Sequence, residues 1–118
     1  MASCKKGFQV VGNVWTALMD FEKAGDIMEG HSHKFTHQTF IACGSFNVVV
    51  AGELYEKVKA PMLMTVEAGL VHSFVALEDN SRAICIHPII KGENYDDIVS
   101  PDDMPLVGGK LPQSLIEA

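Results

Sequence analysis

Three of the five histidines stand close together, at His31, His33 and His37, and a fourth follows at His72. Successive side chains of an extended strand point to opposite faces, so His31 and His33 point the same way. His37 keeps that parity if the strand continues, and it can still converge on them if the chain turns and pairs back. Neutral imidazole offers a nitrogen lone pair near physiological pH. A lone histidine on a strand is usually a core or surface residue, but this clustering predicts a metal site.

Composition limits the classes of partner. The 118 residues make one domain, and a hydrophobic fraction of 47% with a mean hydropathy of +0.15 indicates a well-filled globule. The net charge is -6 and the basic residues are scattered, which argues against nucleic acid and anionic membrane surfaces. No run reaches the roughly 18 apolar residues of a membrane span. The N-terminus lacks the uninterrupted apolar stretch of a secretory signal, so we expect a cytoplasmic protein without membrane contact.

The segment from Phe8 to Pro88 reads as short strands separated by turn residues, with no sustained helical period. Gly44-Ser45 is expected to turn a hairpin, and Glu78 to Ser81 a second one. The expected strands are Phe8–Met19 with an interruption at Gly12-Asn13, Phe21–Met28 with a kink at Gly25-Asp26, His37–Cys43, Phe46–Ala51, Leu54–Val58, Met62–Val66, Ser73–Leu77 and Ala83–His87. This pattern predicts an all-β sandwich or small barrel.

The C-terminal part changes character after Ile89. It is acidic around Glu93 to Asp103 and carries three prolines and a Gly-Gly pair. We therefore expect a single barrel over residues 1–90 and an irregular tail over residues 91–118. At most a short helix is expected, near Gln113 to Glu117. The apolar residues of the tail suggest that it packs on the barrel or on a second subunit.

The histidine spacing resembles the two sequence motifs of the cupin superfamily. The first motif has Gly, five residues, His-x-His, three or four residues, Glu, six residues and Gly. Gly25, His31, His33, His37 and Gly44 fit this frame, with His37 in place of the glutamate.

The second motif of the superfamily reads Pro-x-Gly-x-x-His-x-x-x-Asn. Here Gly69 and His72 are kept, Glu67 stands for the proline and Ala76 for the asparagine. The resemblance covers about Gly25 to Pro88.

This resemblance implies a small antiparallel jelly-roll barrel with metal ligands inside it. His31, His33 and His72 would be ligands, and His37 would take the place of the usual carboxylate. The set is similar to that of small single-domain cupins with four-histidine sites, often found with manganese. It departs from the three-His-one-Glu sites of oxalate-degrading, quercetin-cleaving and germin-type members, so their substrates are not carried over. Small cupins commonly dimerise, so we expect a homodimer in which Phe8–Met19 takes part.

The expected chemistry follows from the ligand set. Four neutral imidazoles leave the charge of a divalent metal uncompensated, which favours an anionic small molecule at the site. Mn or Fe is expected, with Zn, Ni or Cu as alternatives, because imidazole suits them all. We therefore expect a metal-dependent, dioxygenase-like oxidoreductase acting on a small anionic organic molecule. A metal-assisted lyase or isomerase is one alternative, and a non-catalytic module that binds a small molecule or metal is another.

No residue stands out as a general base, so the catalytic residues stay unassigned. Tyr55 and Glu67 are candidates, although exposed turn or strand residues are the commoner case. Gln38 is offset by one position from His37 and is expected to face away. His87 is expected at the surface or around the site rather than as a fifth ligand.

Overall fold

The computed structural model describes residues 2–93 and 104–105. These residues form strands and turns, with no helix long and apolar enough to cross a bilayer among them. The strands are β1 (Lys5–Val11), β2 (Val14–Phe21), β3 (Ile27–His31), β4 (His37–Cys43), β5 (Ser45–Val50), β6 (Glu53–Lys59), β7 (Met62–Val66), β8 (His72–Ala76), β9 (Ser81–Pro88) and β10 (Met104–Pro105).

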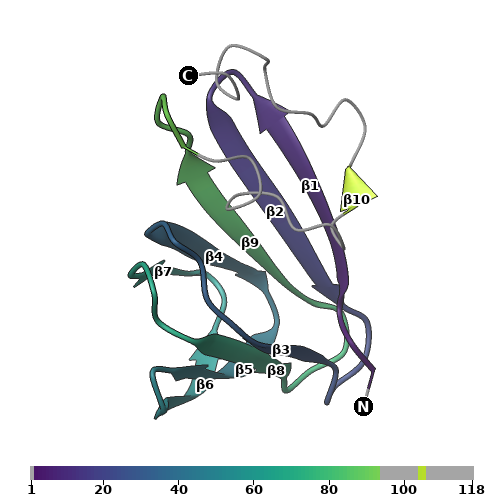
Figure 1. Cartoon of the computed structure of the whole chain (residues 1–118). Helices are drawn as coiled ribbons and strands as arrows, with labels where there is room; N and C mark the ends of the chain where they lie inside the picture. Colours follow the sequence, from purple (N-terminus) through teal and green to yellow (C-terminus); the bar gives the residue numbers. More distant parts are fainter. Residues whose placement is uncertain (1, 94–103, 106–118) are drawn as a thin grey trace.

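The strands pair into two sheets, which confirms the all-β jelly-roll prediction. The larger sheet has the order β10-β1-β2-β9-β4-β7 and the smaller one β3-β8-β5-β6. The pairs are antiparallel except for β1 with β10. Figure 1 shows the smaller sheet low in the view, with β1, β2 and β9 rising above it. When two sheets pack face to face, side chains from both inner faces form the core between them.

Alternating burial along the strands builds that core. In β8 and β9 the interior positions are buried and the intervening ones are more exposed, as the period of two requires. Phe21 of the larger sheet meets Phe46 of the smaller one edge to face, with ring centroids 4.8 Å apart. Phe46 in turn meets Phe74 at 5.7 Å. All three rings are fully buried, each worth about 1.5–3 kcal/mol of hydrophobic stabilisation.

The first predicted strand is a hairpin of β1 and β2, as its Gly12-Asn13 interruption indicated. Val11 pairs with Val14 across the turn, where Gly12 has a φ of +60°. Phe8, Trp15 and Met19 point into the core. The chain's own core therefore accounts for much of the apolar character of this segment, and the homodimer stays a prediction.

The predicted strand Phe21–Met28 is wrong. β2 ends at Phe21, and residues 22–26 form a connection to β3 in the other sheet. The amide of Lys23 donates to the Asp26 carboxylate at 3.1 Å, and the Asp26 amide donates to the carbonyl of Lys23 at 3.0 Å. These local bonds and the positive φ of Gly25 end the extended chain here.

The two hairpins predicted at Gly44-Ser45 and at Glu78–Ser81 are also wrong. β4 pairs with β7 and β9, whereas β5 pairs with β6 and β8. The chain thus changes sheets at Gly44, and it changes back between β8 and β9. Turn residues mark where a strand ends, but the pairing partner depends on long-range packing of both faces.

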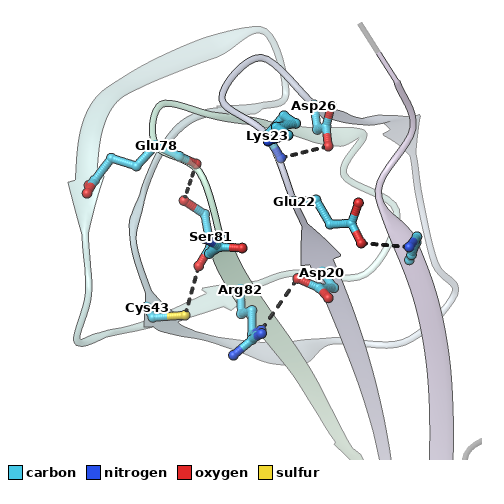
Figure 2. A network of polar contacts seen from close by, with 10 residues as sticks. Asp20, Glu22, Lys23, Asp26, Cys43, Glu78, Ser81 and Arg82 are labelled. Atoms are coloured by element: carbon cyan, nitrogen blue, oxygen red, sulfur yellow. Dashed lines mark hydrogen bonds and ion pairs between the residues drawn. The ribbon is translucent and has the colours of Figure 1, made fainter.

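These two crossings pack against each other at one corner of the barrel. The Ser81 hydroxyl donates to the carbonyl of Glu78 at 2.9 Å, and the Cys43 thiol donates to the carbonyl of Asn80 at 3.2 Å. Figure 2 shows both bonds, together with the ion pair that joins Arg82 of β9 to Asp20 of β2. The corner is therefore held by one local hydrogen bond and by two contacts between segments far apart in sequence.

Of the expected tail, residues 91–93 and the strand β10 (Met104–Pro105) lie in the described part of the chain. This short strand pairs in parallel with β1, with Gly7 opposite Met104 and Phe8 opposite Pro105. The short helix predicted near Gln113 to Glu117 lies outside the described residues. The division into a barrel of residues 1–90 and a tail of residues 91–118 stays a prediction.

Candidate metal centre

Both sheets bring histidines to the same end of the barrel. His31 ends β3 and lies opposite His72, which begins β8 in the smaller sheet. His37 begins β4 in the larger sheet, and His33 lies in the connection between β3 and β4. The strand does not continue past His31, so the residues converge because the chain crosses between sheets. The predicted convergence is found, by a route other than simple parity.

The four imidazoles are close neighbours. One ring nitrogen from each of His31, His33 and His72 lies within 4.8 Å of the other two. The Nε2 atoms of His31 and His33 are 3.1 Å apart. The His37 ring centroid lies 5.1 Å from that of His33 and 5.2 Å from that of His72. All four predicted residues are thus brought together, with the ring nitrogens of His31, His33 and His72 in the tightest group.

Backbone carbonyls set the tautomers of two of these rings. His31 Nδ1 lies 3.0 Å from the carbonyl oxygen of Glu29, and His72 Nδ1 lies 3.0 Å from that of Leu70. A carbonyl only accepts, so each Nδ1 carries the proton and each Nε2 keeps its lone pair. Metal-binding histidines commonly have this arrangement, in which a second partner fixes the ring orientation.

Several ring nitrogens at the cluster lack a hydrogen-bond partner. They are Nε2 of His72 and both Nδ1 and Nε2 of His37, and all three are buried. Leaving a buried polar atom unpaired costs about 1–3 kcal/mol, so such atoms call for a partner. A borderline transition metal accepts imidazole nitrogen, and the donors here are nitrogens alone. The residues present therefore fit a divalent transition metal.

Burial keeps these imidazoles neutral. It lowers the pKa of His33 to about 3, with the charges of His31, His37 and His72 acting in the same direction. Burial also lowers the pKa of His37 to about 4, helped by His72 and His31. The pKa of His72 is lowered too, mainly by burial. Neutral rings keep their lone pairs available at physiological pH.

We expect the metal-free protein to lose stability as the pH falls below about 6.5, the ordinary histidine pKa. Between that pH and the folded-state pKa values of about 4 for His37 and 3 for His33, the unfolded chain binds more protons than the folded one. The free energy of unfolding therefore decreases with decreasing pH across this window. Urea denaturation at several pH values in the presence of chelator measures the slope. His37→Gln should have a shallower slope than the wild type, and an equal slope would contradict the assignment.

Buried side chains follow His37 and His72 along their strands. Thr39 and Ile41 on β4, and Phe74 and Ala76 on β8, are all buried. Gln38 is exposed, as expected from its offset. Aromatic rings border the cluster, since Phe35 stacks on His33 with centroids 4.8 Å apart and Phe74 meets His72 at 6.5 Å.

The two candidate bases do not fit that role. Tyr55 is 44% exposed, and its hydroxyl donates to the carboxylate of Glu53 at 3.1 Å. Glu67 is exposed in the connection between β7 and β8. Neither side chain is buried near the histidine cluster.

His87 is not a surface residue, so that part of the prediction is wrong. The side chain is buried, and its Nε2 donates to both carboxylate oxygens of Glu93, at 2.9 and 3.0 Å. Its ring stacks on Phe35 with centroids 4.1 Å apart. The signal was present in the alternation Ala83-x-Cys85-x-His87, whose three named positions all face the core. Glu93 gave no such signal, because it stands in the acidic stretch that was assigned to the tail.

Comparison with solved structures shows similarity to several cupins at low sequence identity. KdgF from Halomonas sp. is 20% identical, with a TM-score of 0.62 over 71% of this chain and 76% of that one. An RmlC-like cupin from Desulfovibrio desulfuricans is 18% identical, with a TM-score of 0.62 over 73% and 83%. A cupin superfamily protein from Desulfitobacterium hafniense is 12% identical, with a TM-score of 0.63 over 75% and 79%. No protein-family model and no curated protein matches the sequence.

Proposed function

Because this chain has the cupin fold, we propose that it is a metal-dependent cupin that holds one divalent transition metal. His31, His33, His37 and His72 would be the ligands. The observation that carries the proposal is the convergence of four buried or half-buried imidazoles, with ligand nitrogens of His31, His33 and His72 within 4.8 Å of one another and the His37 ring beside those of His33 and His72. No carboxylate belongs to this group of side chains within the described residues.

We infer that the metal is manganese or iron, with zinc, nickel or copper as alternatives. An all-nitrogen set of imidazoles accepts each of these ions, and affinity alone would favour copper or zinc. When bound, the metal would supply Lewis acidity and, for manganese or iron, redox chemistry with dioxygen.

The charge of the site favours an anionic ligand. Four neutral imidazoles leave the full charge of a divalent ion uncompensated, unlike a site with one glutamate. The apolar rings of Phe35 and Phe74 lie against His33 and His72, and a low-dielectric neighbourhood strengthens that attraction. A small organic acid matches both the charge and the apolar surroundings.

We propose a dioxygenase-like oxidation of such an acid as the reaction. The test is a screen of small hydroxy, keto and diketo acids with the manganese- and iron-loaded protein under air and under nitrogen. Oxygen uptake that matches product formation and stops under nitrogen is the expected result. Equal turnover in both atmospheres would contradict the oxidoreductase proposal. The His72→Ala variant, treated with the same metals, is the control for chemistry by free ions.

One observation favours a second candidate, a metal-assisted lyase or isomerase. Such chemistry needs a positioned proton acceptor, and the buried His87 is held by a carboxylate as a general base usually is. Turnover that is independent of oxygen and is lost in His87→Phe would support this class. Binding of small acids with no turnover in either atmosphere would indicate a non-catalytic binding module.

A further inference from the structure

Three residues with nitrogen-bearing rings occupy neighbouring positions on the interior face of the larger sheet. Trp15 of β2 is directly opposite His87 of β9. The ladder between β9 and β4 ends at Ile86 and Gln38, so the next residues, His87 and His37, are also neighbours. The side chains of Trp15, His87 and His37 are 3%, 4% and 2% exposed. Directly opposed residues have Cβ atoms about 4.5–5.5 Å apart. The three positions therefore form a row that begins at the proposed ligand His37 and extends across the sheet to Trp15.

Two members of the row have no partner for a buried ring nitrogen. They are Nε1 of Trp15 and Nδ1 of His87. Both atoms are outside the proposed ligand set, so the metal does not account for them. Each would cost about 1–3 kcal/mol if it were left unpaired. The two atoms belong to directly opposed residues, which is the basis for assigning them one shared ligand below.

Glu93 decides which kind of hydrogen bond His87 makes. Its carboxylate accepts from His87 Nε2, so the proton is on Nε2, and in this tautomer the lone pair is on Nδ1. Glu93 is itself fixed, since its carboxylate accepts from the amide of Ile90 and its own amide donates to the carbonyl of Ile90. His87 Nδ1 is therefore an acceptor, whereas the indole N–H of Trp15 is only a donor.

Phe35 connects this pair to the metal centre. Its ring stacks on His87 at 4.1 Å and on His33 at 4.8 Å, and it meets Trp15 edge to face at 5.9 Å. One aromatic side chain thus contacts a proposed metal ligand and both members of the pair. A molecule of a few carbon atoms bound at the centre would have Phe35 as its apolar neighbour.

We propose that Trp15 and His87 form a subsite for a hydroxyl group of the small acid bound at the metal centre. A hydroxyl can accept from Trp15 and donate to His87 with the same oxygen. A carboxylate or a ketone only accepts, and a methyl group does neither. The ligand class is then a small hydroxy acid or enol whose anionic end lies at the histidine cluster. This inference rests on the proposed function and specifies its ligand.

The test compares lactate with propionate, which lacks the hydroxyl, on zinc-loaded protein. Trp15 is the only tryptophan, so its indole N–H gives a single resonance in a ¹⁵N-labelled sample. Lactate should shift that resonance and bind at least about tenfold more tightly than propionate, since an analogue that lacks the hydroxyl leaves both ring nitrogens unpaired. His87→Phe keeps the aromatic stack and should lose this preference while it retains zinc. Thr65→Val removes a hydroxyl from an exposed position of β7 and should retain the preference.

Trp15→Phe, followed by calorimetry, gives the same test independently should the His87 variant fail to fold. It keeps an apolar ring, loses the N–H and should also bind both acids equally. Equal affinities of the wild type for lactate and propionate, or an indole resonance that lactate does not shift, would overturn the inference. If the same protein still bound one equivalent of zinc, the proposed function would stand. A protein that binds none of zinc, manganese and iron would overturn the proposed function, and this inference with it.

Discussion

His37→Ala is expected to remove the bound metal and the stabilisation that the metal provides. A ligand that binds only the folded state at 100 times its Kd adds about 2.7 kcal/mol to the free energy of unfolding. His37 is buried and neither of its ring nitrogens has another partner, so its loss leaves the metal three ligands. Thermal melting with and without metal, combined with elemental analysis, measures both effects.

Gln38→Ala is the matched control for that variant. Gln38 is the next residue on the same strand and is exposed on the opposite face. It should keep both the metal and the metal-dependent rise in Tm. If His37→Ala binds as much metal as Gln38→Ala, His37 is not a ligand.

Gly44→Ala is expected to destabilise the fold by roughly 2–5 kcal/mol, from backbone strain together with overpacking. Gly44 has a φ of +79°, and a Cβ there would lie 2.0 Å from Oγ, 2.6 Å from Cβ and 2.8 Å from Cα of Ser81. Two of these atoms belong to a side chain, but the Cα belongs to the backbone of the β8–β9 crossing. The midpoint of urea denaturation measures the loss.

Gly52→Ala separates the two contributions to that loss. Gly52 has a φ of +80°, yet a Cβ there would meet nothing within 4 Å. It should show only the strain of a positive φ, roughly 1 kcal/mol. Equal destabilisation by both variants would show that the close packing of Gly44 on Ser81 contributes nothing.

The local pattern of the sequence predicted the strands well and their pairing less well. Alternating apolar residues and turn glycines located β4 to β9 to within a few residues, because these signals are short-range. The crossing at Gly44 could not be predicted in this way. A glycine that turns a hairpin and a glycine that changes sheets carry the same local signal, and only the packing against Ser81 separates them.

The same distinction applies to the site. The histidine spacing indicated which residues gather, and the structure brings all four together. The pair of His87 and Glu93 was missed because its partners come from a strand end and from the stretch after it. Trp15 is buried in the core, and whether its N–H finds a partner depends on residues of other strands. Hydrogen-bond partners that come from different strands cannot be predicted from the sequence pattern of one strand.

The most direct measurement is elemental analysis of the untagged protein, followed by a metal-loaded crystal structure with anomalous scattering at the edge of the metal found. The account predicts about one equivalent of a divalent transition metal per chain. It also predicts a single anomalous peak bonded to ring nitrogens of His31, His33, His37 and His72. A protein that stays free of metal after incubation with manganese, iron and zinc, or a peak at other side chains, would contradict it.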